Sequence, residues 1–224
     1  MEFSLDIAAK YPPSYLSYAQ EGEDLILHRF FERQKKGFYV DVGAHHPTRF
    51  SNTFIFYLRG WRGINIEPTP GSKEIFDTVR PEDINLECAI GKSERLVFHV
   101  FNEKALNTFD AAHVINVCET NTQYFVEKKL EITKEPLADI LDKHMPHGVT
   151  IDFLNIDAEN SDLEAAQSNH WEKYRPHLVL IENHDRKGKA GQAPIRDFMK
   201  ACDYELAFKT VNTDFFRDAR RMAL

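Results

Sequence analysis

Two acidic residues, each associated with a short apolar run, constrain this chain more than any other feature. The first run, Phe38–Val42, contains Asp41 and leads directly to Gly43, and the second run, Gly63–Ile66, leads directly to Glu67. Glycine lets a backbone approach a ligand closely, and a carboxylate at the end of the second run can accept hydrogen bonds from both hydroxyls of a ribose. The layout is therefore typical of a nucleotide-type cofactor site.

Apolar runs alternate with helical patterns along most of the chain. Extended segments are predicted at 38–42, 63–66, 84–90, 96–101, 124–132, 151–156 and 178–181, with a closing hairpin at 204–209 and 215–216. Helices are predicted at 21–32, 71–79, 111–118, 136–144, 161–168 and 195–201, and Ser51 or Asn52 is expected to cap one that ends near Gly60. The alternation predicts an α/β, Rossmann-like fold with a mostly parallel sheet, helices on both faces and a C-terminal antiparallel hairpin.

Length and composition favour one globular domain. The 224 residues can bury one sizeable core, and no repeat or linker divides them, so we predict a single domain with an N-terminal arm and helix over 1–36 and the core over 37–224. The net charge of −7 argues against a nucleic-acid binder, and no apolar run approaches the length of a membrane span. Three cysteines without metal-ligand spacing, and a start without a secretory signal, favour a reduced, cytoplasmic setting.

The ends of the predicted strands collect polar residues. In open α/β sheets, ligands bind beyond the carboxyl ends of the strands. The residues at these ends are Asp41, Glu67, Ala89, Ile90, Asp157 and the group Glu182-Asn183-His184. We therefore expect them to line one cleft, with residues 102–134 shaping the pocket for a second substrate.

Five ordered stretches of the chain resemble a known family. They are 19–24 (AQEGED), 38–47 (FYVDVGAHHP), 51–53 (SNT), 60–68 (GWRGINIEP) and 151–157 (IDFLNID). The chain resembles the FkbM-type methyltransferases over roughly residues 18–183. The resemblance implies the class I methyltransferase fold, with a seven-stranded sheet, and S-adenosylmethionine as cofactor.

The resemblance also implies roles for the residues at the first two strand ends. Asp41 and Gly43 would contact the methionine half of S-adenosylmethionine. Glu67, followed by Pro68, would hold the hydroxyls of the ribose. His45, in the loop after Gly43, is interpreted as a structural residue.

Further cofactor contacts follow from the same resemblance. Ala89 and Ile90 would flank the adenine. Ser51 and Asn52 would supply polar groups near the carboxylate of the cofactor, helped by a helix N-terminus. Gln20, in the entrance motif of the family, would close over the cofactor.

Members of this family commonly methylate hydroxyls of sugars, so the expected function is O-methylation of a sugar or glycan. An alcohol nucleophile must lose its proton, and the candidates for the general base are Glu159 and His184, with Asp157 orienting the acceptor or the amine of the cofactor. The family pattern Asp-x-Glu-Gly becomes Asp157-Ala158-Glu159-Asn160 in this chain. Asparagine tolerates left-handed backbone, so the turn is expected to persist.

Other interpretations stay open at this point. The chain could methylate oxygen or nitrogen of another small molecule, or it could be a non-catalytic cofactor-binding module that partners a glycosyltransferase. No metal is predicted, although carboxylates could alternatively bind Mg²⁺ through Asp157, Glu159, Asp162, Glu182, His184 and Asp185. An NAD-dependent dehydrogenase is disfavoured, because the loop after Asp41 lacks the second and third glycines of the dinucleotide fingerprint.

Overall fold

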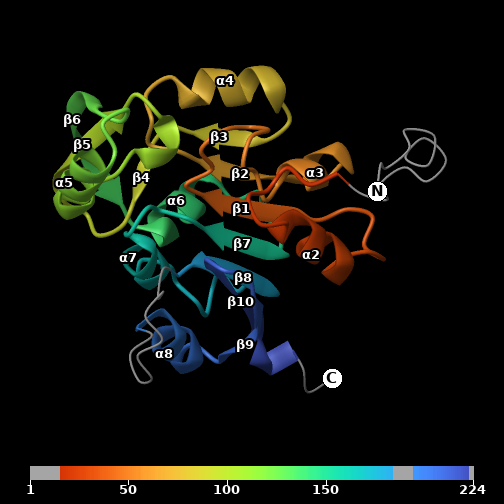
Figure 1. Cartoon of the computed structure of the whole chain (residues 1–224). Helices are drawn as coiled ribbons and strands as arrows, with labels where there is room; N and C mark the ends of the chain where they lie inside the picture. Colours follow the sequence, from red (N-terminus) through yellow and green to blue (C-terminus); the bar gives the residue numbers. More distant parts are fainter. Residues whose placement is uncertain (1–15, 184–193, 222–224) are drawn as a thin grey trace, which may run out of the picture.

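The computed structural model describes residues 16–183 and 194–221, and these residues are built around a seven-stranded sheet (Figure 1). The strand order is β3-β2-β1-β7-β8-β10-β9. The strands are β1 (Phe38–Val42), β2 (Arg62–Ile66), β3 (Ile84–Leu86), β7 (Phe153–Ile156), β8 (Leu178–Glu182), β9 (Tyr204–Lys209) and β10 (Thr213–Asp218). Neighbours from β3 to β8 pair in parallel, and β10 pairs antiparallel with both β8 and β9. The predicted sheet and its C-terminal hairpin are confirmed.

Helices cover both faces of this sheet, as predicted. On one face, α6 (Leu137–His144), α7 (Asp162–Gln167) and α8 (Pro194–Ala201) pack onto apolar residues such as Val40 and Leu154. On the other face, α2 (Glu23–Phe30) and α3 (Phe54–Leu58) contribute to a second core around Tyr39 and Phe153. Successive residues of a strand point to opposite faces, so β1 supplies both cores. Helix α4 (Ser72–Val79) lies beside β3.

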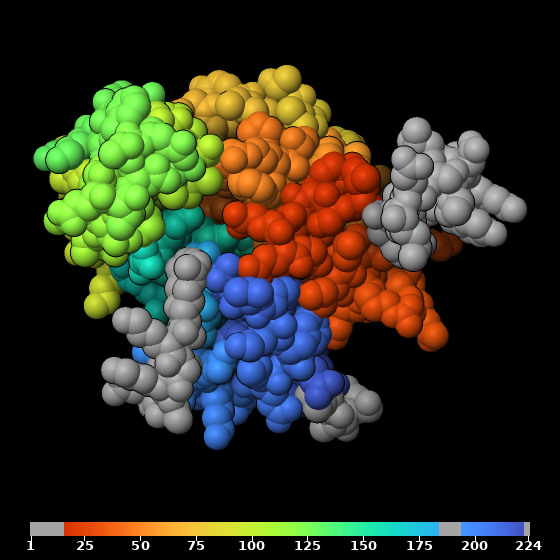
Figure 2. Space-filling view, viewed as in Figure 1, coloured from red at the N-terminus to blue at the C-terminus, as the bar shows by residue number. Residues whose placement is uncertain are grey.

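A second, smaller sheet lies beside the carboxyl ends of the main strands (Figure 1). It contains β4 (Ala89–Ile90), β5 (Arg95–Phe101) and β6 (Val126–Glu135) in the order β4-β6-β5. The short 3₁₀ helix η1 (Lys104–Leu106) and the helix α5 (Ala111–Thr120) connect β5 to β6, and a second 3₁₀ helix, η2 (Ala219–Arg221), follows β10. In the space-filling view the small sheet and α5 form a separate lobe (Figure 2).

The prediction of one continuous strand over 84–90 is wrong. Its first part, β3, pairs with β2 as far as Leu86, and its second part, β4, pairs with β6 through Ala89 and Ile90. Between them Glu87 turns away and accepts the backbone N–H of Gly71 at 2.7 Å. An apolar run shows that a segment is extended but not which strand it joins, so the sequence could not reveal this change of sheet.

The expected helix cap is also displaced. The N-cap position of α3 is Thr53, one residue beyond Asn52 and two residues beyond Ser51, the two predicted caps. Ser51 still contributes, because its hydroxyl oxygen accepts the backbone N–H of Phe54 at 3.1 Å.

A row of buried polar side chains crosses the main sheet at one level. Asp41 lies opposite Asn65 on β2 and Asn155 on β7, and Asn65 lies opposite Asn85 on β3. These four residues, which we call the polar row, are each at most 5% exposed. Two direct hydrogen bonds connect neighbours, from Asn155 to Asp41 at 2.9 Å and from Asn65 to Asn85 at 2.8 Å.

Across residues 16–183 and 194–221, we find no helix with both the length and the apolar composition that a bilayer crossing requires.

Candidate cofactor and active site

A cleft opens where β1, β2 and β7 end against the small sheet, with an empty volume of about 910 Å³ that includes its mouth. Most of the predicted site residues line it, and these are Gln20, Asp41, Gly43, Asn52, Glu67, Pro68, Ala89, Ile90, Asp157 and Glu159. Parallel strands deliver their carboxyl ends to one edge of the sheet, so positions far apart in the sequence meet there.

Among the described residues, one predicted site residue is not part of this wall. Ser51 is buried behind the cleft, where its hydroxyl oxygen accepts an N–H of the Arg80 guanidinium at 2.7 Å. His184 lies outside the described residues. The structure therefore places Ser51 as a support of the cleft wall.

Position 43 needs a glycine because of its own backbone conformation and its close contact with another strand end. Its φ is +76°, and a Cβ added there would lie 1.7 Å from the carbonyl oxygen of Asp157. Its N–H donates to the carbonyl oxygen of Ile66 at 2.9 Å. The expectation was that this glycine lets the backbone approach a ligand, whereas here it lets the ends of β1 and β7 approach each other.

Glu67 ends β2 with a buried carboxylate that lines the cleft. One oxygen accepts the backbone N–H of His45 and the other accepts the backbone N–H of Thr69, each at 2.9 Å. Burial raises the pKa of Glu67, and the bonds from Thr69 and His45 oppose that rise. The side chain of Thr69 also hydrogen bonds to this carboxylate. Because a carboxylate oxygen can accept more than one hydrogen bond, Glu67 keeps capacity for a further donor.

Asp41 is held in the polar row with both oxygens occupied. One accepts the amide of Asn155 at 2.9 Å, and the other accepts the hydroxyl of Thr53 at 2.7 Å. Burial raises the pKa of Asp41, while these two bonds and the charge of Arg80 lower it. Asn52 donates to the amide oxygen of Asn155 at 3.0 Å, which connects the cleft wall to the row.

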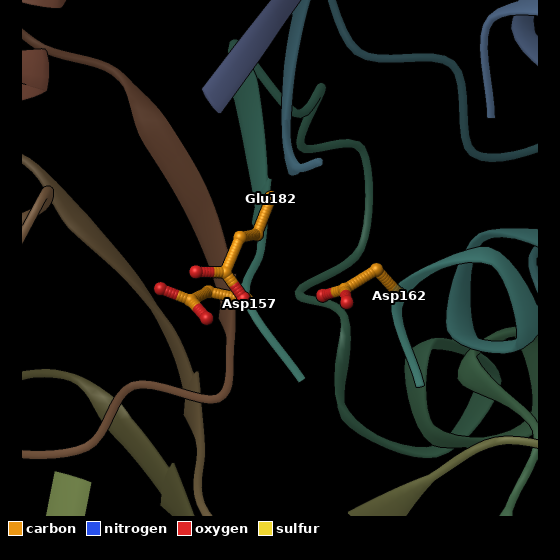
Figure 3. Close-up of side chains that lie close together, drawn as sticks. All are labelled: Asp157, Asp162 and Glu182. Carbon is orange, nitrogen blue, oxygen red and sulfur yellow. The ribbon is translucent and has the colours of Figure 1, made fainter. Parts of the chain in front are cut away.

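Three carboxyl groups meet at the ends of β7 and β8 (Figure 3). Atoms of Asp157, Asp162 and Glu182 lie within 4.8 Å of one another, with Glu182 beside Asp157 and Asp162 pointing toward both. Burial, followed by the charges of Glu182 and Glu159, raises the pKa of Asp157 well above its ordinary value. Such a group can share a proton or coordinate a divalent cation. Of the residues considered for Mg²⁺, His184 and Asp185 lie outside the described residues.

The turn after β7 keeps the shape that the family's glycine would permit. Glu159 and Asn160 both have left-handed backbone, with φ of 47° and 72°. The expectation that asparagine would tolerate this turn is confirmed.

The sequence analysis does not single out several residues of the cleft wall as site residues, and these are His45, Phe50, Phe98, Lys104, Ala105, Asn107, Thr108, Phe109, Asn155 and Ser161. For Asn155 a signal existed, because it is polar in the middle of an apolar strand. His45 was interpreted as structural, and its N–H does hold Glu67. Burial lowers the pKa of His45 to about 4, and its Nε2 has no hydrogen-bond partner among the described residues.

The segment before α5 closes one side of the cleft and bonds to three strand-end loops. Asn107 donates to the hydroxyl of Thr69 at 2.8 Å, and the hydroxyl of Thr108 donates to the carbonyl oxygen of Glu159 at 3.2 Å. Arg49 and Glu103 form an ion pair at 2.9 Å. Part of the stretch 102–134, which was predicted to shape the pocket for a second substrate, therefore does line the cleft.

The comparison with protein families agrees with the resemblance seen in the sequence. The model of the Methyltransferase FkbM domain matches residues 41–206. A search of curated proteins gave no match. Among the solved structures that match is an O-methyltransferase from Bacillus cereus in complex with SAH, with 12% identity, a TM-score of 0.43 and coverage of 95% of this chain and 84% of that chain. This structural likeness is weak, and the assignment rests on the family model, which spans most of the chain: the protein belongs to the FkbM methyltransferase family.

Proposed function

We propose that this protein is an S-adenosylmethionine-dependent O-methyltransferase that acts on a hydroxyl of a sugar or glycan. The observation that carries the proposal is Glu67, a buried carboxylate in the cleft wall, held by the backbone N–H groups of His45 and Thr69 and with acceptor capacity left for a ligand. That arrangement suits the two adjacent hydroxyl donors of a ribose.

The rest of the cleft fits the remaining parts of this cofactor. Ala89 and Ile90 provide a buried apolar surface at the start of the small sheet, which suits an adenine ring. On the side of β1, Gln20 and Asn52 provide polar groups for an amino acid moiety. The Nε2 of His45 is a further buried polar atom whose hydrogen-bonding capacity the described residues leave unused.

S-adenosylmethionine supplies an already activated methyl group, and the protein has to align an acceptor oxygen and remove its proton. Alignment accounts for much of the acceleration in such displacements, and a general base adds about 10²–10⁴-fold. We assign the base to Glu159 or His184. Asp157, whose pKa is raised by burial and by the charge of Glu182, binds a proton more readily than an ordinary carboxyl group and suits the role of a hydrogen-bond donor that orients the acceptor.

Two observations support a sugar acceptor. Members of this family commonly methylate hydroxyls of sugars, and the cleft wall combines aromatic and amide side chains. Phe50, Phe98 and Phe109 line the cleft alongside the amides of Gln20 and Asn107. A sugar presents apolar C–H faces together with hydroxyls, and rings next to amides can serve both.

Calorimetry with S-adenosylmethionine tests the proposed identity of the cofactor. Binding of this compound with no binding of NAD supports it, and the reverse result removes it. A panel of nucleotide sugars and glycans, followed by transfer of a labelled methyl group, tests the acceptor. Transfer only to other small molecules would replace the sugar assignment. Cofactor binding without transfer would favour a non-catalytic module that partners a glycosyltransferase.

Glu67→Gln tests the residue that carries the proposal. The substitution removes the charge and sets an NH₂ group against a backbone N–H, so we expect cofactor affinity to fall about 10- to 100-fold, the range for a hydrogen bond to a charged group. Glu74→Gln on the exposed side of α4 is the matched control and should leave the affinity unchanged. Equal affinities of the two variants in calorimetry would show that Glu67 does not bind the ribose.

A further inference from the structure

Arg80 is completely buried at the C-terminal end of α4, with every N–H of its guanidinium in use. Its Nε and its Nη2 both donate to the carbonyl oxygen of Pro47, and Nη2 also donates to the hydroxyl oxygen of Ser51 at 2.7 Å. Its Nη1 donates to the hydroxyl of Thr53 at 2.8 Å and to the side-chain oxygen of Asn65 at 3.2 Å. Because a guanidinium has five N–H donors, these five bonds satisfy it fully.

Most of these acceptors belong to the segment 44–53, which joins β1 to α3 without helix or strand. Such a segment has no backbone ladder to hold its shape, so side-chain bonds add to the few backbone bonds that it makes, such as Ser51 N–H to the carbonyl oxygen of Tyr18. Four of its residues, Ala44, His45, Phe50 and Asn52, line the cleft. Arg80 itself does not line the cleft, and it contacts the segment from behind.

Arg80 also connects the two halves of the polar row, which are not directly bonded between Asn65 and Asp41. Thr53 accepts an N–H from Arg80, and its single hydroxyl hydrogen goes to Asp41. Asp41 in turn accepts the amide of Asn155, which leaves the oxygen of Asn155 to accept the amide of Asn52. Each bond therefore fixes the direction of the next, from Arg80 to the cleft wall.

We propose that Arg80 is a positioning residue of the cofactor site, which fixes the segment 47–53 and, through Thr53, the hydrogen-bond directions of Asp41, Asn155 and Asn52 before a cofactor binds. This inference rests on the proposed function, since it assigns Arg80 a part in binding S-adenosylmethionine. Burying a guanidinium away from water costs free energy unless its N–H groups are hydrogen bonded. The hydrogen bonds of Arg80 go to the residues that it aligns.

The charges around Arg80 give the inference a pH-dependent readout. Asp83 lies 4.0 Å from Nη1 and accepts the hydroxyl of Tyr39. On the other sides, the charge of Arg80 lowers the pKa of both Asp41 and His46, and the charge of Asp41 raises the pKa of Glu67. Burial pushes the pKa of Asp41 upward, so loss of the Thr53 bond or of the Arg80 charge should let Asp41 become protonated at higher pH.

Arg80→Lys and Arg175→Lys form a matched pair for the first test. Arg175 is likewise an arginine with several hydrogen-bond acceptors, the backbone carbonyl oxygens of Cys202 and Asp203 and the carboxylate of Asp218, but it lies in the C-terminal hairpin region. Lysine has three donors on one nitrogen and cannot reach all the partners of either arginine. We expect Arg80→Lys to weaken binding of S-adenosylmethionine at least tenfold, and Arg175→Lys to leave the affinity within about twofold while its melting temperature falls comparably.

Thr53→Val and Thr53→Ser form a second pair, which decides the question even if Arg80→Lys does not fold. Valine is close in shape to threonine but removes the hydroxyl between Arg80 and Asp41, whereas serine keeps it. Calorimetry across pH should show affinity for S-adenosylmethionine falling on acidification in every variant. The midpoint should lie at higher pH for Thr53→Val, and Thr53→Ser should restore the wild-type midpoint.

The outcomes separate this inference from the proposed function. A wild-type protein that does not bind S-adenosylmethionine would overturn the proposed function. Wild-type binding with equal losses in the two arginine variants, or with superimposed pH profiles for the two Thr53 variants, would overturn the role of Arg80 alone.

Discussion

Asp157 ends β7 at a point where burial and neighbouring charges all oppose its ionisation. Burial is the largest cause, and Glu182, Glu159 and Asp162 follow. Like-charged carboxylates this close share protons rather than ionise together. The native protein therefore binds a proton at Asp157 more tightly than the unfolded chain does.

Asp157→Asn should change how stability depends on pH. Because the folded-state pKa is raised, the stabilisation from the bound proton is complete below the ordinary carboxyl pKa and is lost as pH rises through the raised value. We expect the variant to gain stability relative to wild type as pH rises, by about 1.4 kcal/mol for each unit of pKa elevation. Urea unfolding of both proteins across pH measures this difference.

Asp142→Asn is the control for that series. Hydrogen bonds from Lys173 and Tyr174 lower the pKa of Asp142, so the stabilisation that ionised Asp142 gives the folded protein is lost only as pH falls. Parallel stability curves for wild type and Asp157→Asn would contradict a raised pKa for Asp157 in the folded protein.

At the scale of elements, the connection from β7 to α7 is the place where this chain departs from the family pattern. Glu159 and Asn160 occupy successive left-handed conformations there, and α7 begins at Asp162 after the N-cap Ser161. Left-handed backbone is unfavourable for residues with a Cβ, with asparagine among the better tolerated. The turn places Glu159 in the cleft wall.

Substitutions of Asn160 should separate the backbone requirement from any effect on an acceptor. Asn160→Ala should destabilise the protein by about 1 kcal/mol, because alanine cannot bond locally to offset the left-handed strain. Asn160→Gly, which restores the family residue, should be neutral or slightly stabilising. Chemical denaturation measures both, and equal stability of the two variants would show that the turn relaxes to another conformation.

At the scale of the whole molecule, the small sheet contacts the main body through Ile90, which belongs to the main hydrophobic core, and through polar side chains. One of the polar contacts is partly buried: Lys134 on β6 is 2% exposed and pairs with Glu164 on α7 at 2.8 Å, where Glu164 is 26% exposed. Lys134 also donates to the hydroxyl of Ser161 at 3.2 Å and lies over the ring of Phe109. This contact joins the small sheet to the helix that follows the acidic end of β7.

Glu164→Ala should loosen the attachment of the small sheet. It leaves the buried ammonium of Lys134 without its carboxylate, and since Glu164 is partly exposed we expect a loss of roughly 1–3 kcal/mol, below the range for a fully buried pair. Hydrogen exchange should accelerate in β5 and β6 while β1 and β7 stay protected. Glu131→Ala, which removes an exposed partner of Arg95 at 2.6 Å, is the control and should cost at most about 1 kcal/mol. Uniform acceleration across both sheets would contradict a local attachment.

Local patterns were enough to predict most strands of the main sheet. The bounds of β1 were predicted at 38–42 and are Phe38–Val42, because five consecutive buried residues leave a pattern that needs no knowledge of the partner strands. The strand-end positions of Asp41 and Glu67 followed for the same reason, and so did the prediction that they share a cleft.

The sequence by itself thus determined the α/β alternation and the edge of the sheet where a ligand would bind. The tertiary structure alone decided that 84–90 divides between two sheets, that Asp157, Asp162 and Glu182 meet, and that Arg80 supports the loop after β1. The physical reason is that these features depend on interactions over different distances along the chain. Periodicity and strand ends are set by neighbours along the chain, whereas strand partners and buried hydrogen bonds are chosen by side chains that come together only when the whole molecule folds.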